Sequence, residues 1–600
     1  MSMTPIALYI PASEVFPGLQ SDFGTFRKLL ASLSLTDTLF WCARLNLIVS
    51  DPSEHDHIAR QQFGISQFLG KQEVRAVNEF VRRQTDKRNV TIFFRGQVLE
   101  LLRWVILYCE DQPGDGNTFE NEEVRRNFAK AALIASDIWA RRVFANRFSL
   151  DGGVDTARQR ALGSIRKSME ATSTASDLPR TLGRGWALFS KYFPRNYRAC
   201  ETEFQAATGL SVEEYYICLC GIITNFMNPK INNGIFDSTI LGSSTPYAEV
   251  LARYLALESQ SVEDLRESLW TQHVDDIRGF DDALPYDYRP LREKPIMRAR
   301  DGRAIIIDPM FYSEKASVGP LFHLLGERWP AEKANRIFGA FGNSFEEYCC
   351  DILRRMFPDT DGALSKRLEC NLIIRGDSRP QSEIEIDACV DDVVETVIFE
   401  MKAVWIREDE ILIDRYEDFL EHLRKKYGVT SGGDREGRVK GVGQLARIVN
   451  ALASEAVAIY NGRFAEAQLV YPVLVVHDPL LGAPVYGNIL ASEFSGCLVP
   501  DAENAPGEIR KGRLRVAPLI IMTVEDLEDL ETSIEYFGLR DLFADYTRDC
   551  ADRLTSLHNF MAFSDYKDKM YHSRSAASKA LEILKKTQER VFPSGAIGAG

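Results

Sequence analysis

Glu383-Ile-Glu-Ile-Asp-Ala-Cys-Val390, followed after a short acidic turn by Thr396-Val-Ile-Phe-Glu-Met-Lys-Ala403, is the stretch that decides the fold of the C-terminal half. Side chains alternate between the two faces of a strand, so Glu400 and Lys402 point to one face and their apolar neighbours to the other. A hairpin that turns near residues 391–395 brings Asp387 close to Glu400. The two segments therefore predict paired strands that present two carboxylates and one ammonium group on one patch of sheet.

The chemistry of this patch indicates a divalent metal ion. Neighbouring carboxylates repel each other and raise each other's pKa unless a positive charge lies between them. Mg²⁺, with Mn²⁺ as a substitute, prefers one or two carboxylates and keeps positions open for water and phosphate. Such an ion activates water and stabilises charge on phosphoryl oxygens, while Lys402 orients the nucleophile or neutralises the developing charge. We therefore expect phosphodiester hydrolysis, with Asp387 and Glu400 as metal ligands and Lys402 as a catalytic residue.

The surrounding pattern predicts an α/β domain over residues 336–525. Strands are expected at 368–374, 383–390, 396–404, 468–477 and near 516–522, and helices at 341–357 and 443–456. On the first of these helices, Phe341 and Phe345 belong to the expected buried stripe. Glu346 borders that stripe, whereas Glu347 points more toward solvent. Glu346 is therefore the acid of this helix that we expect to border the buried face.

Asp387, twelve intervening residues and then Glu400-Met-Lys402 resemble the motif of the PD-(D/E)xK nuclease superfamily. Members often carry an acid on a first helix in a GxxFE motif, which Gly342-Asn-Ser-Phe-Glu346 matches, and a polar residue on a later helix, which Gln444 matches. The chain departs at Ile386, where a proline is usual, and at Ile448, where some branches have tyrosine. The resemblance implies a restriction-endonuclease-like fold with a central mixed sheet and Mg²⁺-dependent endonuclease activity. The implied metal ligands and catalytic residues are Glu346, Asp387, Glu400, Lys402 and Gln444.

Cations gather between Glu421 and Arg447, where seven of them stand against three acids in a chain of net charge −14. Residues 428–437 are typical of a flexible loop, which could close over a phosphate backbone. A solvated helix end is the alternative interpretation. The expected nucleic-acid contacts, with DNA favoured, are Arg424, Lys425, Lys426, Arg435, Arg438 and Lys440.

Six hundred residues are too many for one hydrophobic core, so several domains are expected. Apolar residues three and four apart indicate a mainly helical N-terminal half, including a capping box at Ser211 and Glu214. Asp301-Gly302 indicates a β-hairpin. The expected segments are a helical region at 1–170, a second helical packet at 185–290, a β-hairpin and helix connector at 291–335, the nuclease domain at 336–525, and a C-terminal helical segment and tail at 526–600.

Composition indicates a cytoplasmic protein that does not enter a membrane. Apolar residues make up 45% and charged residues 26% of the chain, as in ordinary globular proteins. No secretion signal is recognisable, and the longest apolar run, residues 215–227, is too short to span a bilayer. The eleven cysteines lack paired CxxC spacing, so we expect reduced, buried thiols. The net negative charge argues against nonspecific coating of nucleic acid, but not against a local basic groove.

The layout, with a large helical region beside the nuclease domain, resembles Shedu-type proteins. By that analogy we favour a DNA nuclease in bacterial antiphage defence, whose helical region senses or regulates. A homo-oligomer or a regulatory protein partner is compatible with the same layout. Two alternatives stay open: an RNA-directed or transposon-associated nuclease, and a non-enzymatic interaction scaffold with a vestigial nuclease fold.

Overall fold

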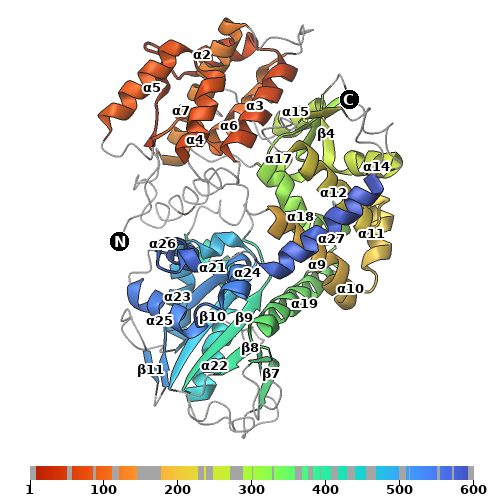
Figure 1. Cartoon of the computed structure of the whole chain (residues 1–600), viewed down its shortest axis with the longest axis vertical. Helices are drawn as coiled ribbons and strands as arrows, with labels where there is room; N and C mark the ends of the chain where they lie inside the picture. The colour runs from red at the N-terminus through yellow and green to blue at the C-terminus, as the bar shows by residue number, and fades with distance from the viewer. Residues whose placement is uncertain are drawn as a thin grey trace. The chain divides into compact units, whose positions relative to one another are not determined.

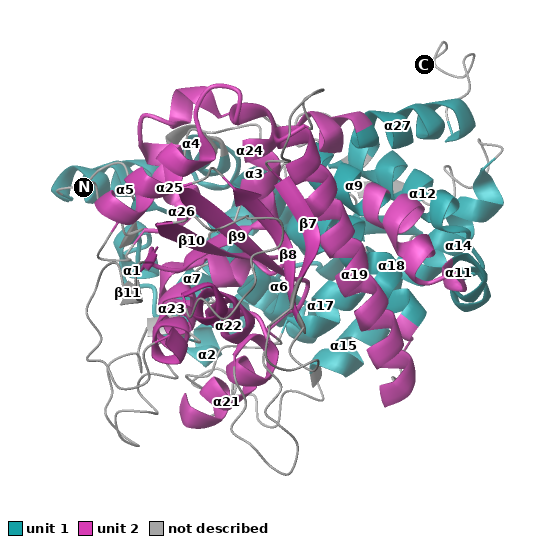
Figure 2. Cartoon of the chain, turned by 90° about the horizontal axis from the view of Figure 1, so that it is seen from below, with its two compact units in different colours: residues 1–186, 201–324, 579–600 teal, residues 187–200, 325–578 magenta. Residues whose placement is uncertain are grey.

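The computed structural model of the chain divides into two compact units, each drawn from several stretches of sequence. Unit 1 comprises residues 1–186, 201–324 and 579–600, and unit 2 comprises residues 187–200 and 325–578 (Figures 1 and 2). The structure describes residues 8–50, 57–84, 90–110, 121–144, 162, 178–227, 235–237, 247–270, 288–299, 302–326, 330–358, 368–375, 383–391, 394–406, 416–428, 440–453, 468–498, 509–511, 514–550, 555–570 and 573–591.

Helices predominate in unit 1, which confirms the prediction of a mainly helical N-terminal region. They are α1 (Ala12–Val15), α2 (Phe23–Ala31), α3 (Leu35–Val49), α4 (His57–Phe68), α5 (Lys71–Arg83), α6 (Arg95–Tyr108), α7 (Glu122–Phe144), α9 (Leu178–Ala187), α11 (Cys200–Thr208), α12 (Val212–Phe226), α14 (Ala248–Glu258), α15 (Val262–Trp270), α17 (Arg289–Glu293) and α18 (Pro309–Leu325). Two small sheets accompany them. In one, β1 (Leu8–Tyr9) pairs in parallel with β2 (Val90–Thr91), and in the other the strand order is β3 (Ile235–Asp237), β6 (Arg303–Ile306), β5 (Ile296–Arg298), β4 (Ser259–Ser261).

Local sequence signals in unit 1 are confirmed. Ser211 caps α12 by accepting a hydrogen bond from the Glu214 amide, and the Glu214 carboxylate accepts one from the Ser211 amide. The hairpin of β5 and β6 turns at Gly302, whose φ of +86° favours a residue without a Cβ atom. Elsewhere in unit 1, a buried ion pair of 2.7 Å joins Arg95 of α6 to Asp308. Each of these two charges compensates the other in the apolar core, where water cannot solvate them.

A mixed sheet forms the centre of unit 2. Its order is β11 (Ile509–Lys511), β12 (Leu514–Val516), β10 (Leu469–Val476), β9 (Glu395–Lys402), β8 (Glu383–Asp391), β7 (Leu368–Arg375), with β13 (Ile520–Thr523) also paired to β10. Strands β7, β8 and β9 are antiparallel neighbours, whereas β10 runs parallel to β9, β12 and β13. A multidomain chain with helices and a central mixed sheet is thereby confirmed.

One predicted strand is present but divided in two. The segment near residues 516–522 forms two short strands, β12 and β13, which pair with β10 at successive positions. Pro518 stands between them, and proline has no amide hydrogen to donate to a sheet ladder. The strand therefore breaks there.

The helices of unit 2 cover this sheet. They are α10 (Phe193–Asn196), α19 (Ala331–Met356), α21 (Tyr416–Tyr427), α22 (Val442–Ala453), α23 (Pro484–Leu498), α24 (Val524–Ser533), α25 (Leu539–Asp549), α26 (Leu557–Phe563) and the start of α27 (Arg574–Val591), with the π-helical turn η3 (Leu188–Tyr192) and the 3₁₀ turns η5 (Pro479–Gly482) and η6 (Lys567–Lys569). Helix α19 begins ten residues before the expected 341–357 helix. It packs against β7, β8, β9 and α24, while α22 packs with α23 (Figure 2).

Two further expectations concern the thiols and the membrane. All eleven cysteines are free, and all except Cys370 and Cys497 are buried. Among the described residues no single helix is long and apolar enough to cross a membrane, and α11 and α12 reach that length and composition only as a pair bent by 59°. Buried aliphatic and aromatic side chains account for the apolar character of α12.

Candidate active site

The antiparallel pairing of β8 and β9 ends at the predicted catalytic residues. Ala388 pairs with Phe399, so the next pair along the two strands is Asp387 and Glu400. The backbone ladder stops before that pair, and Oδ2 of Asp387 accepts a hydrogen bond of 2.7 Å from the Met401 amide instead. The Asp387 side chain is therefore held at the point where the two strands separate.

Lys402 lies against both carboxylates. Its Nζ is 2.6 Å from Oε1 of Glu400 and 3.9 Å from Oδ2 of Asp387. The Glu400 side chain is fully buried, while the Lys402 side chain keeps 18% of its surface exposed. The structure thus brings together the three residues that strand alternation predicts on one patch.

Burial disfavours the charged form of each of these side chains and therefore shifts its pKa. Burial raises the pKa of Glu400 to about 8, and repulsion from Asp387 and Glu346 adds to the rise that the Lys402 ammonium partly offsets. Burial likewise raises the pKa of Asp387, against the attraction of Lys402 and the Met401 hydrogen bond. Burial opposes the charge on Lys402, but the carboxylates of Glu400, Asp387 and Glu346 outweigh it and raise the Lys402 pKa above its ordinary value. Three acidic side chains therefore share one ammonium group, and the pKa values of all three stay above their ordinary values.

Glu346 of α19, the acid that the family resemblance implies, interacts electrostatically with Asp387 and Lys402. Burial raises the pKa of Glu346 to about 7, and the Asp387 carboxylate contributes the next largest part of the rise. Phe341 and Phe345, which have no exposed surface, anchor the same helix. The neighbouring Glu347 instead accepts a hydrogen bond of 3.1 Å from the Asn196 side chain. Of these two neighbouring acids, Glu346 therefore interacts with the charges of the patch, whereas Glu347 is engaged by Asn196.

Gln444 and an additional acid lie at the edge of the patch. Nε2 of Gln444, near the start of α22, donates a hydrogen bond of 3.4 Å to the backbone carbonyl of Glu385. Glu385 is exposed on β8, and its carboxylate raises the pKa of both Asp387 and Glu346. Sequence reasoning missed Glu385, although the alternation in Glu383-Ile-Glu-Ile-Asp387 places it on the same face as Asp387.

The donor set fits a hard divalent cation. Oε2 of the buried Glu400 has no hydrogen-bond partner among the described residues, and buried carboxylate oxygens without partners are rare in folded proteins. Carboxylates are also the ligands that Mg²⁺ and Mn²⁺ prefer. Within the described ranges, no three His, Cys, Asp or Glu side chains are already gathered as a metal site. The carboxylates are arranged around the Lys402 ammonium, which supplies the counter-charge in this arrangement.

The predicted nucleic-acid contacts are only partly described, and most of those described already have partners. Arg424 forms an ion pair of 2.6 Å with Glu493. Lys425 forms one of 2.9 Å with Glu421, and Lys426 donates a hydrogen bond to the Trp405 carbonyl. Lys440 is exposed next to Gly441, while Arg435 and Arg438 lie outside the described residues. The local excess of cations is therefore smaller than the sequence count indicates, because Glu493 lies outside the counted segment.

Comparisons of the chain with protein-family models, with curated proteins and with solved structures find no match.

Proposed function

We propose that the chain is a divalent-metal-dependent nuclease of the PD-(D/E)xK superfamily that hydrolyses phosphodiester bonds, with DNA as the favoured substrate. The observation that carries this proposal is the convergence of Asp387, Glu400 and Lys402 where β8 and β9 separate. The order of the elements also supports it: α19 is followed by three antiparallel strands and then, after α21 and α22, by β10 parallel to β9. A restriction-endonuclease-like fold is part of the same proposal.

Asp387, Glu400 and Glu346 are the residues that would hold Mg²⁺ or Mn²⁺. Their raised pKa values mean that cation binding displaces protons, after which the carboxylates act as anionic oxygen ligands. When bound, the ion supplies activation of water and stabilisation of charge on the phosphoryl oxygens. The Met401 amide keeps Asp387 oriented toward the patch throughout, because that hydrogen bond is to the backbone.

Lys402 has a distinct role in this proposal. Its raised pKa keeps it an ammonium ion at neutral pH, so it always carries protons to donate. A phosphate oxygen that gains negative charge in the transition state competes with Glu400 for that ammonium, and the interaction strengthens as the charge develops. The Gln444 side chain, half-buried at the edge of the patch, is placed to donate to a water molecule or a phosphate oxygen.

The biological role is proposed by analogy of layout alone. Most of the chain belongs to unit 1, which contains none of the site residues and has its own hydrophobic core. An independent unit of this size beside a hydrolase is suited to sensing or restraint. We therefore propose a nuclease in bacterial antiphage defence, regulated through unit 1 or through a protein partner. RNA as the substrate is the second candidate, because metal-dependent hydrolysis of a phosphodiester bond is the same chemistry in both polymers.

Cleavage assays on plasmid DNA, linear DNA and RNA with Mg²⁺, Mn²⁺ or EDTA test the proposal. We expect metal-dependent cleavage by the full-length chain. Lys402→Ala and Asp387→Ala should each lower the rate by about 10²-fold or more while changing the melting temperature little. Glu347→Gln, one position from Glu346 but directed to Asn196, is the matched control and should cleave at the wild-type rate.

Normal cleavage by Lys402→Ala would remove the site assignment. A wild-type protein that cleaves none of the substrates, alone or with cell extract added as a source of an activating partner, would leave the interaction scaffold as the better explanation. Cleavage of RNA without cleavage of DNA would replace the favoured substrate with the second candidate.

A further inference from the structure

Helix α19 carries the metal-site acid Glu346 on one flank and a row of polar side chains on the other. On the site flank, one helical turn beyond Glu346, the Cys350 thiol lies 3.6 Å from the backbone carbonyl of Asp387. A helix turns by about 100° per residue, so Arg355 lies about half a turn around the axis from Glu346. Tyr348 and Asp351 fall on the Arg355 side and at helical spacing from it. The two flanks therefore face different parts of unit 2.

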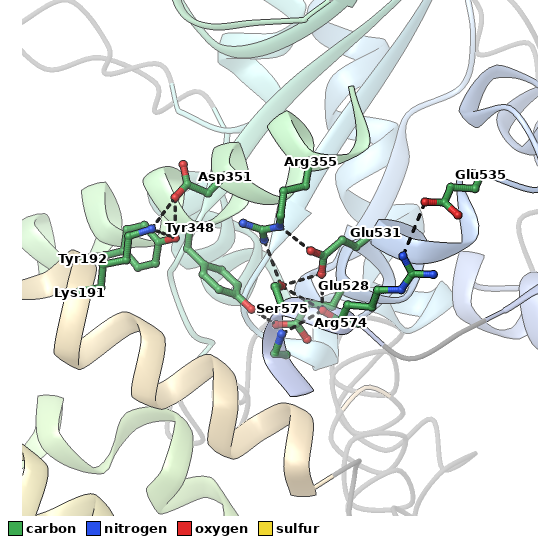
Figure 3. A network of polar contacts seen from close by, with 12 residues as sticks. Lys191, Tyr192, Tyr348, Asp351, Arg355, Glu528, Glu531, Glu535, Arg574 and Ser575 are labelled. Carbon is green, nitrogen blue, oxygen red and sulfur yellow. Dashed lines mark hydrogen bonds and ion pairs between the residues drawn. The ribbon is translucent and has the colours of Figure 1, made fainter. Parts of the chain in front are cut away.

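On the flank of α19 opposite Glu346, called the far flank below, Asp351 contacts the π-helical turn η3. Oδ2 of Asp351 accepts hydrogen bonds of 2.9 Å from Lys191 and 2.7 Å from the Tyr192 hydroxyl (Figure 3). Burial alone would raise the pKa of Asp351, but these two donors outweigh it and lower the pKa. The carboxylate is therefore ionised at neutral pH, which strengthens both contacts.

Arg355 and Tyr348 tie the same flank to α24. Nε of Arg355 contacts Oε1 of Glu531 at 2.5 Å, and the Glu531 side chain is only 5% exposed. Ser575 at the start of α27 links the two, because it accepts from Arg355 and donates to Glu531 (Figure 3). The Tyr348 hydroxyl donates a hydrogen bond of 2.6 Å to the fully buried Glu528. Charge-assisted contacts from two directions thus restrain rotation of α19 about its own axis.

The consequence for Glu346 follows from helix dimensions. A side-chain tip lies about 5–6 Å from the helix axis, so a rotation of about 10° moves it by about 1 Å. Functional groups at a metal or catalytic site must be held within about 0.5 Å, and an error of about 1 Å costs on the order of 10²-fold in rate. The buried stripe alone permits small rotations, because apolar contacts are not directional.

We propose that Asp351 and Arg355 are positioning residues, which hold α19 in the rotation that directs Glu346 toward Asp387 and Lys402. The inference rests on the proposed metal-dependent function and assigns these residues no contact with substrate. Lys191 and Tyr192 lie in residues 187–200, which unit 1 precedes and follows in sequence, and Ser575 lies shortly before the chain enters residues 579–600 of unit 1. The segments that hold these partners of α19 are thus continuous in sequence with unit 1.

The test compares two double variants of the full-length protein. Asp351→Asn with Arg355→Gln removes the charges on the far flank without changing the net charge. Glu535→Gln with Arg574→Gln is the matched control, since this exposed pair, 3.8 Å apart, lies in the same neighbourhood and no hydrogen bond or ion pair among the described residues joins it to α19 (Figure 3). Binding of Mn²⁺ is measured by isothermal titration calorimetry at pH 8, and DNA cleavage is measured at increasing Mn²⁺ concentration.

We expect the first variant to bind Mn²⁺ about 10- to 100-fold more weakly, the range seen when partners of metal ligands are removed. Excess Mn²⁺ should restore its kcat toward the wild-type value, with KM for DNA unchanged, and the control should match wild type. If the double variant does not fold, Asp351→Asn alone, which keeps an acceptor for Tyr192, should shift Mn²⁺ binding in the same direction.

Wild-type Mn²⁺ affinity in a folded variant would overturn the positioning role while leaving the proposed function in place. A fall in kcat that no Mn²⁺ concentration restores would overturn the positioning role as well. A wild-type protein that binds no Mn²⁺ would remove the proposed function, and the positioning role with it.

Discussion

Replacing Glu400 with glutamine should make the metal-free protein more stable at alkaline pH, because burial disfavours the charged form of the wild-type carboxylate. The pKa of Glu400 is about 8 against an ordinary value of 4.5. In the folded protein this group therefore keeps its proton between pH 4.5 and pH 8, where the unfolded chain has lost it. Folded wild type binds more protons than unfolded wild type in this window, so its free energy of unfolding falls as pH rises.

The size of the effect follows from the same values. Each tenfold change in proton affinity corresponds to about 1.4 kcal/mol, which gives about 4 kcal/mol at pH 8 as an upper value. Entry of water and relaxation around the charge reduce it, so we expect a gain of about 2–4 kcal/mol for Glu400→Gln at pH 8. Below pH 4.5 both side chains are neutral and of nearly equal shape, so the two proteins should be equally stable.

Urea unfolding of both proteins in EDTA at pH 4.5, 6.5 and 8 measures this difference. Glutamine still accepts a hydrogen bond from Lys402, and Asp387 remains 3.9 Å from that ammonium, so the variant leaves no new unpaired cation. Glu347→Gln controls for the general loss of one negative charge. A difference that does not depend on pH, or a variant less stable than wild type at pH 8, would refute the reasoning.

The remaining predictions concern metal binding and packing. Mn²⁺ affinity should rise between pH 6 and pH 8, because Glu346 and Glu400, with pKa values of about 7 and about 8, lose to the buffer the protons that compete with the cation. Calorimetry in buffers of different ionisation enthalpy should detect that proton release, and an affinity that is flat with pH would contradict it. Gly185→Ala should lower the free energy of unfolding by about 1–3 kcal/mol or more, since its Cβ would meet the Ala316 carbonyl oxygen at 1.7 Å. Gly342→Ala, where nothing lies within 4 Å of the added Cβ, should instead stabilise α19 by up to about 1 kcal/mol in thermal unfolding.

Features with a local periodic signal were predictable. The alternation in β8 and β9 has a period of two residues, and the short connection between the strands leaves few registers. Asp387 and Glu400 could therefore be paired from sequence, and the structure has them as the next pair beyond Ala388 and Phe399. The Ser211 cap is equally local, because both of its partners lie within four residues.

Features that depend on distant partners were not predictable. The sequence count indicated a basic patch at the cations of α21, because Glu493, the partner of Arg424, lies 69 residues further along the chain and outside the counted segment. The contact between Arg355 and Glu531 spans 176 residues and leaves no periodic trace. The second acid on β8, Glu385, is a different case: the alternation marks its face, but nothing in the sequence distinguishes it from an exposed strand residue.

A crystal of the full-length protein soaked in Mn²⁺ tests the central claim most directly, because the anomalous signal locates the ion independently of activity. We expect a peak within about 2.0–2.4 Å of carboxylate oxygens from both Asp387 and Glu400, with Glu346 close enough to contribute directly or through water. No peak on this patch, or one that leaves Asp387 and Glu400 in contact with Lys402 alone, would contradict it.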